Sequence, residues 1–411
     1  MVPRMTDAFW SLITAPWALQ PDTLLGAALL ALVAALLGEV VWRLLRWPRM
    51  LGYTVVGTLL AIAGSGATGH EPALRVAIDG ALALLLFEAG ARLNLRWLAR
   101  NPWLLASSVA EAALAGIAVW LVLRSFALAP DVAVPLAIIA AAVSPAVLLR
   151  VTGELHAAGQ VTERLLALAA LNTLYAVLAM KLFSAGLLLS DPGTWVEALS
   201  PVLFSFCGSI LLGAALGEGL ALSARRLDLR EENAMVLLLA AVLLALVLAK
   251  TAQLSALLVP LLAGIWLRNR SERPWVWPRH FGSAGGVLVL VMFVSVASAW
   301  RLDGLAPAIG IAAVLVLTRA AAKSVAILAL ARPSGLGIAQ AMCLGVALLP
   351  MSGTAWVLGL DYAARHPAAG AQLMPLLLAA LALLEFAAPL LVMASLRVAG
   401  EIEVQRGGSP Q

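Results

Sequence analysis

The sequence predicts an all-α membrane protein that crosses the bilayer many times. Of its 411 residues, 63% are hydrophobic and 12% are charged, whereas soluble domains are about half apolar and about a quarter charged. The apolar residues form long blocks, and about 20 helical residues span the hydrocarbon layer. The alternation of apolar and polar residues that marks a membrane β-barrel is absent. Because backbone groups in lipid need internal partners, the blocks are expected to be helices.

About thirteen transmembrane helices are expected from these blocks. The predicted spans are 22–46, 48–66, 73–91, 102–124, 131–150, 163–188, 199–224, 231–250, 254–269, 282–300, 305–331, 336–362 and 370–397. The loops between them are short, so residues 1–411 are expected to form a single membrane domain without an appended soluble domain.

The basic residues indicate how the chain is oriented. Of the 27 Lys and Arg residues, 18 follow odd-numbered spans, six lie on the opposite side and three lie within spans. Lys and Arg accumulate in cytoplasmic loops. We therefore expect a multi-pass protein of the cell inner membrane, with its N-terminus outside, its C-terminus in the cytoplasm and the lipid bilayer as its surroundings.

Several function classes have no support in the sequence. The cysteines, Cys207 and Cys343, lie in apolar blocks and are expected to be small core residues. The four histidines fall in predicted loops without ligand spacing, so no metal site is expected. No nucleophile motif or acidic loop cluster is present. We expect no enzyme activity, no cofactor and no nucleic-acid partner.

Two of the predicted spans are interrupted near mid-depth. The interrupting residues are Ser144 and Pro145 in the first, and Pro350, Ser352 and Gly353 in the second. Proline removes a backbone donor and clashes with the preceding turn. The two spans are seven apart, so they cross in opposite directions, as in the inverted repeats of secondary transporters. The alternative is that each proline merely kinks a membrane helix.

Ionisable residues lie at the centre of the spans that flank these interruptions. Glu111 is central in 102–124, Glu385 is central in 370–397, and Arg319 and Lys323 lie one turn apart in 305–331. A charge at mid-membrane costs about 2.5–3.5 kcal/mol on insertion scales, so such residues are functional candidates. The alternative is a structural Glu–Arg pair that locks the bundle. The sequence leaves open which carboxylate meets Arg319.

The span 163–188 carries a further polar group within an apolar helix. Asn172 and Thr173 lie together near its middle, and Lys181 follows two turns later. Lys181 is expected either to act as a cation in the core or, near the end of the span, to extend to the membrane interface.

Four stretches of the sequence are distinctive: "LRWPRMLGYTVVGTLLA" (45–61), "ALLLFEAGARLNLRWLAR" (83–100), the break "VSPAVL" and "LTRAAAKSVAI" (317–327). Together they resemble the monovalent cation:proton antiporter superfamily, in its sodium/proton exchanger group. The resemblance covers essentially all thirteen spans in order. It implies that the two discontinuous helices cross each other.

The resemblance also implies a homodimer of two-part protomers. Residues 22–91 plus 231–300 would form a scaffold and dimer subdomain. Residues 102–188 plus 305–397 would form a core transport subdomain, with 199–224 as a linker helix. An elevator-like movement of the core would expose the site to each side in turn.

The chain departs from the resembled family at both of its usual carboxylates. In the family, the sixth span carries an acidic residue, and the position that aligns with it here is Thr173, preceded by Asn172. The family's Thr-Asp-Pro triplet in the first broken helix is Val143, Ser144 and Pro145 in this chain. The basic residue of the eleventh span is present as Arg319 or Lys323. If exchange is retained, another carboxyl must carry the proton: Glu111 first, then Glu88 or Glu385.

These observations predict a secondary transporter that exchanges a small monovalent cation, Na⁺ or K⁺, for protons by alternating access. Its ion or substrate site would include Ser144, Pro145, Asn172, Thr173, Ser352 and Gly353. The alternative is the same fold without proton exchange: a uniporter, a carrier of an anion or organic solute, or an inactive regulatory homologue.

Overall fold

The computed structural model describes residues 23–63, 72–188, 195–226, 231–270, 281–300 and 302–402. Within these residues the elements are α2 (Thr23–Leu45), α3 (Met50–Ile62), α4 (Pro72–Arg92), α5 (Leu95–Arg100), α6 (Pro102–Ser125), α7 (Pro130–Ala141), α8 (Pro145–Glu154), α9 (Gln160–Leu188), α10 (Trp195–Arg226), α11 (Glu231–Thr251), α12 (Leu258–Arg270), α13 (Phe281–Ser298), α14 (Leu302–Ala329), α15 (Ile338–Ala347), α16 (Gly353–Arg365) and α17 (Pro367–Val398). The regular secondary structure of the described part is helical, apart from an isolated bridge between Ala157 and Ile402.

The predicted spans correspond to these helices in order. Eleven of them match one described helix each, and the two interrupted spans match the pairs α7–α8 and α15–α16. By length and composition, seven described stretches could cross a membrane: residues 28–45, 102–125, 130–154, 160–187, 199–223, 307–329 and 367–398. The predicted span ends at 22 and 64–66 lie outside the described residues.

One short helix, α5, was not predicted from the sequence. It lies in the connection between α4 and α6, where the residues are too few and too polar for a span. Its first turn is capped by Asn94, whose side-chain oxygen accepts a hydrogen bond of 3.1 Å from the Trp97 backbone N–H. Asparagine favours this position because it satisfies an orphan helix donor.

The distribution of side chains is that of a membrane protein, with apolar residues outside and charges inside. On α14, Leu317 and Val325 are 69% and 57% exposed, whereas Arg319 and Lys323 are fully buried. Arg319 and Lys323 are four residues apart, so they lie on one face of the helix. A soluble helix shows the opposite arrangement, with its apolar stripe turned to the core.

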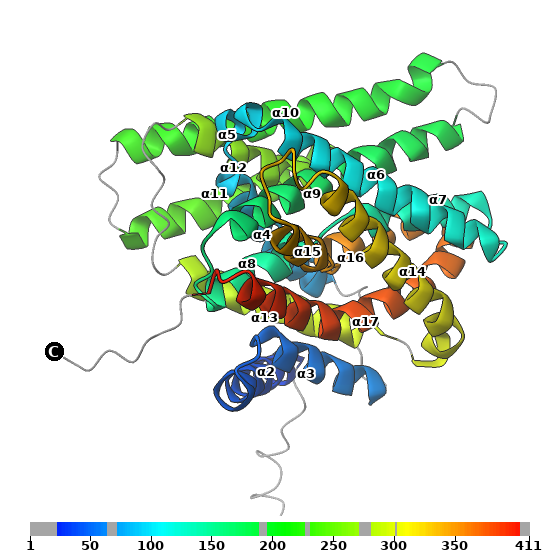
Figure 1. Cartoon of the computed structure of the whole chain (residues 1–411). Coiled ribbons are helices and arrows are strands. Elements are labelled where there is room, and N and C mark those ends of the chain that lie inside the picture. Colours follow the sequence, from blue (N-terminus) through cyan, green and yellow to red (C-terminus); the bar gives the residue numbers. More distant parts are fainter. Residues whose placement is uncertain are drawn as a thin grey trace, which may run out of the picture.

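Close helix contacts depend on small residues, as is usual in membranes. Gly90 of α4 and Gly264 of α12 face each other's helix, and a Cβ added at either would lie 2.1 Å from a carbonyl oxygen opposite. α13 packs against α3 and α4, while α14 packs against α6, α15 and α17. Figure 1 shows α2 and α3 at one edge and the short helices α15 and α16 near the centre.

The two interrupted spans meet at their breaks. The first runs from the end of α7 at Ala141 to the start of α8 at Pro145, and the second from Ala347 to Gly353. The Ser144 backbone N–H donates to the Pro350 carbonyl over 2.9 Å, which joins one break to the other. Pro145 begins α8, where a proline is tolerated because the first helical N–H has no intrahelical partner. The predicted pair of discontinuous helices is therefore confirmed.

Candidate functional site

Arg319 holds the two breaks together through backbone carbonyls. Its Nε donates to Ala140 O over 2.5 Å and its Nη2 to Ala142 O over 2.7 Å, at the end of α7. On the side of α15, Nη1 donates to Leu349 O over 2.5 Å and Nη2 to Leu348 O over 3.3 Å. The last carbonyls of a helix lack internal partners and carry partial negative charge. A buried guanidinium satisfies both helix ends at once.

Glu111 pairs with Lys323. Its Oε2 accepts a hydrogen bond of 2.5 Å from Lys323 Nζ, and its Oε1 accepts one from Asn172 Nδ2. Lys323 Nζ also donates to Ala141 O over 2.9 Å. All three side chains are at most 1% exposed. The sequence left open which carboxylate pairs with Arg319. In the structure Glu111 pairs with Lys323, and Arg319 donates its hydrogen bonds to backbone carbonyls.

Three buried oxygens near the breaks have no hydrogen-bond partner among the described residues. They are Ser144 Oγ in the first break, Asn172 Oδ1 on α9 and Thr354 Oγ1 in the first turn of α16. Thr173 Oγ1, by contrast, donates to Ala169 O of its own helix over 3.0 Å. Buried acceptors usually have partners, and carbonyl, amide and hydroxyl oxygens suit hard cations. Thr354 was not predicted from the sequence, because its position gives no signal beyond its neighbours Ser352 and Gly353.

Glu385 belongs to a second, separate cluster. Its Oε1 accepts a hydrogen bond of 2.6 Å from Ser352 Oγ in the second break, and its Oε2 accepts one of 3.2 Å from Thr54 Oγ1 on α3. Glu385 is 2% exposed, and the two hydroxyl residues are at most 1% exposed. Thr54 lies in one of the motif stretches, yet a lone threonine in an apolar span gave no reason to single it out.

Glu88, the remaining predicted carboxyl, pairs with Arg92 instead of with a buried cation. The contact of 2.8 Å joins residues four apart in the last turns of α4, with side chains 19% and 39% exposed. This placement does not favour Glu88 as the carrier of a proton. Gly353 and Pro145 are the first residues of α16 and α8, so their contribution to the site is backbone geometry.

A polar cavity of about 680 Å³ begins one turn beyond Thr173, where Val177 lines it. Arg75 of α4 contacts Asp361 of α16 over 3.2 Å at this cavity, and Lys250 pairs with Asp79. Lys181 lines the cavity too. It therefore lies neither in the buried cluster nor on an apolar outer face.

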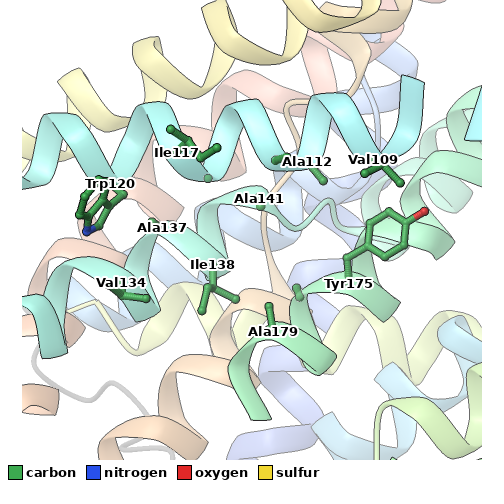
Figure 2. A pocket seen from close by; sticks show the side chains of 13 residues that line it. Val109, Ala112, Ile117, Trp120, Val134, Ala137, Ile138, Ala141, Tyr175 and Ala179 are labelled. Atoms are coloured by element: carbon green, nitrogen blue, oxygen red, sulfur yellow. The ribbon is translucent and has the colours of Figure 1, made fainter. Parts of the chain in front are cut away.

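An apolar groove of about 460 Å³ lies between α6, α7 and α9. Its lining includes Ile117 and Trp120 of α6, Ile138 of α7 and Tyr175 of α9, all labelled in Figure 2. No charged side chain lines this groove. Its chemistry suits hydrocarbon, so the buried Glu111 cluster and not the groove is the candidate ion site.

The fold and the buried charges define a class: a multi-pass helical membrane protein with two broken helices that meet around ionisable side chains, as in secondary transporters. The sequence matches the transmembrane family model of the sodium/hydrogen exchangers over residues 28–394. The chain therefore belongs to the sodium/hydrogen exchanger family, whose members are transporters and not enzymes.

Solved structures agree with this assignment at the level of the fold. The sodium proton antiporter MjNhaP1 from Methanocaldococcus jannaschii, solved at pH 8, is 15% identical with a TM-score of 0.62, covering 90% of this chain and 94% of that one. An electron-microscopy map of the same antiporter gives 16% identity and a TM-score of 0.72, covering 93% of this chain and all of that one. No curated protein matched the sequence.

Proposed function

We propose that this protein exchanges a monovalent cation, Na⁺ or K⁺, for protons across the membrane by alternating access. The observation that carries the proposal is the fully buried Glu111 carboxylate, held between Lys323 and Asn172 beside the broken helices. Thr173 supplies no carboxylate on α9. Glu111 of α6 places its carboxylate next to the side-chain amide of Asn172, the neighbour of Thr173, so an acidic group is present where a cation could bind.

The exchange follows from the charge balance of the pair. A cation that binds Glu111, with help from the free oxygens of Asn172, Ser144 and Thr354, takes the place of the Lys323 ammonium. The ammonium would then be buried without a counter-charge, which costs several kcal/mol. It avoids this cost by releasing one proton from Nζ. One cation enters as one proton leaves, and the net charge of the site does not change.

Arg319 serves this exchange as a fixed support. Guanidinium stays protonated in proteins, and its four carbonyl partners belong to both breaks. Arg319 therefore keeps α7 and α15 in register whichever partner Glu111 holds.

The arrangement of the protomer is part of the proposal. The core (102–188 plus 305–397) would move against a scaffold (22–91 plus 231–300), with 199–224 as linker and the scaffold as homodimer contact. In support, α14 packs on α6 and α17, and α13 packs on α3 and α4. We propose an inner-membrane location with the N-terminus outside, which the positions of Lys and Arg support. The polar cavity would then open to the outside.

Everted membrane vesicles test the proposal. Addition of Na⁺ or K⁺ should dissipate a preformed pH gradient in vesicles that contain the wild-type protein. Glu111→Gln should abolish the response, because Gln can neither bind the ammonium ionically nor neutralise a cation. Glu88→Gln is the matched control and should retain activity, since Glu88 pairs with Arg92 near the surface. Absence of any response to Na⁺, K⁺ or Li⁺ in the wild type would contradict the proposal.

A second candidate is the same fold without proton exchange: a uniporter, an anion or organic solute carrier, or a regulatory homologue. It is favoured by the missing carboxyl at Thr173, whose hydroxyl is bonded to its own helix, and by the permanent charge of Arg319. The discriminating variant is Thr173→Asp. If sodium/proton exchange appears only in this variant, the second candidate is correct.

A further inference from the structure

Glu385 has no cationic partner in the described structure, which sets it apart from Glu111. Its two hydrogen bonds come from the hydroxyls of Ser352 and Thr54. The three residues lie on different segments: the second break, α3 and α17. Each is at most 2% exposed, so bulk water does not solvate the carboxyl.

The two fully buried cations on the neighbouring helices, Arg319 and Lys323, are engaged elsewhere. Among the residues whose side chains the structure describes, the titratable ones on the elements packed against α17 are Arg319 and Lys323 on α14, Cys343 on α15, Asp361, Tyr362 and Arg365 on α16, Asp131 on α7, Arg150 and Glu154 on α8, and Tyr53 on α3. Arg319 donates to the four carbonyls of the breaks, and Lys323 pairs with Glu111. Within the described part of the chain, no ion pair reaches Glu385.

Hydroxyl groups can hydrogen-bond to a carboxyl group in either its protonated or its ionised state. Ser and Thr oxygens each offer one donor and two acceptor positions, and the hydrogen rotates to suit. Both can donate to a carboxylate, or one can accept from a protonated Glu385 while the other still donates. The Lys323 ammonium has donors alone, so it favours an ionised Glu111. An ionised carboxylate buried without a cation costs several kcal/mol, which a single proton removes.

We propose that Glu385, Ser352 and Thr54 form a second proton-binding site, separate from the Glu111–Lys323 pair. In this site Glu385 of α17 bridges α3 and the second break. When the proton is bound, Glu385 is a neutral donor to one hydroxyl; when it is released, the same hydroxyls donate to the carboxylate. One consequence rests on the proposed transport cycle: Glu385 is neutral when it moves away from Thr54 only if it carries the proton.

Infrared difference spectroscopy between low and high pH tests the site on the purified full-length protein in lipid. The carbonyl stretch of a buried protonated carboxyl should be present at low pH and lost at high pH. Glu385→Gln should remove this band, whereas Glu111→Gln and the control Glu88→Gln should keep it. Persistence of the band in Glu385→Gln would overturn the proposal. The measurement requires no transport. The proton site can therefore be confirmed even if the proposed exchange is wrong, and it can be refuted even if the exchange is correct.

Two further variants address the case in which Glu385→Gln does not fold. Thr54→Val keeps the shape of the side chain and removes its hydroxyl, so it should move the pH midpoint of the band. Thr54→Ser restores the hydroxyl and should return the midpoint to the wild-type position. If Thr54→Val leaves the midpoint unchanged, the α3 hydroxyl is not part of the site and the proposal fails.

Discussion

The buried pair between Glu111 and Lys323 should show strong energetic coupling. The two side chains are fully buried and in contact over 2.5 Å. Removal of one partner forces the other either to remain an uncompensated buried charge or to change its protonation state, and breaking a buried pair in this way destabilises proteins by about 3–5 kcal/mol. Removal of both, with apolar side chains of similar volume, is often close to neutral. Glu111→Leu and Lys323→Met should therefore each be far less stable than the double variant, with a coupling energy of about 3 kcal/mol.

The same protein offers a matched control pair. Glu88 and Arg92 are partly exposed and four residues apart on α4. Such pairs contribute about 0.3–0.5 kcal/mol, so a cycle of Glu88→Gln and Arg92→Met should give a coupling about an order of magnitude smaller. The two cycles share the chain, the detergent environment and the unfolded state.

Reversible unfolding of the detergent-solubilised protein, followed by its helical circular dichroism, measures both cycles. If the coupling of Glu111 with Lys323 is no larger than that of the control pair, the burial argument is wrong. The proton release assigned to Lys323 would then lose its physical basis.

Two further predictions concern packing and can be measured in the same unfolding assay. Arg319→Lys should destabilise the protein by about 1–3 kcal/mol, the cost of leaving buried carbonyls unsatisfied, because one ammonium cannot replace a planar guanidinium that donates to four carbonyls at two helix ends; full stability of Arg319→Lys would mean that charge alone suffices. Gly264→Ala should cost about 1–3 kcal/mol, because the new Cβ would lie 2.1 Å from the Phe87 carbonyl oxygen. Gly310→Ala, where nothing lies within 4 Å of the added Cβ, is its control and should be neutral or stabilising by up to about 1 kcal/mol; equal effects of the two would contradict the close α4–α12 contact.

The architecture could be predicted from the sequence because lipid imposes simple rules. Long apolar blocks and the prolines at 145 and 350 sufficed to predict the helices and both breaks. The helix α5 was missed because a six-residue capped turn has no hydropathy signal. Intrahelical patterns also placed Arg319 and Lys323 on one inward face.

The pairing within the site could not be predicted, because it depends on how helices far apart in sequence pack. Arg319 was a reasonable partner for a glutamate, yet its fork matches the carbonyl ends of α7 and α15, while the more compact Lys323 ammonium meets Glu111. These carbonyls belong to alanines and leucines, whose side chains say nothing of such a role. Thr54 likewise joins Glu385 across 331 positions of sequence.

Four of the buried ionisable side chains, those of Glu111, Arg319, Lys323 and Glu385, also bear on how the membrane potential acts on the proposed transport cycle. With both glutamates ionised, Glu111 and Glu385 balance Arg319 and Lys323, and this set carries no net charge. A proton on Glu385 leaves the set with one positive charge. Moving that charge across the full membrane thickness changes its energy by about 2.3 kcal/mol at a potential of 100 mV. Movement of the core would then be insensitive to voltage in one state and driven by it in the other, so a single hydroxyl-lined carboxyl would set the electrical character of the transport cycle.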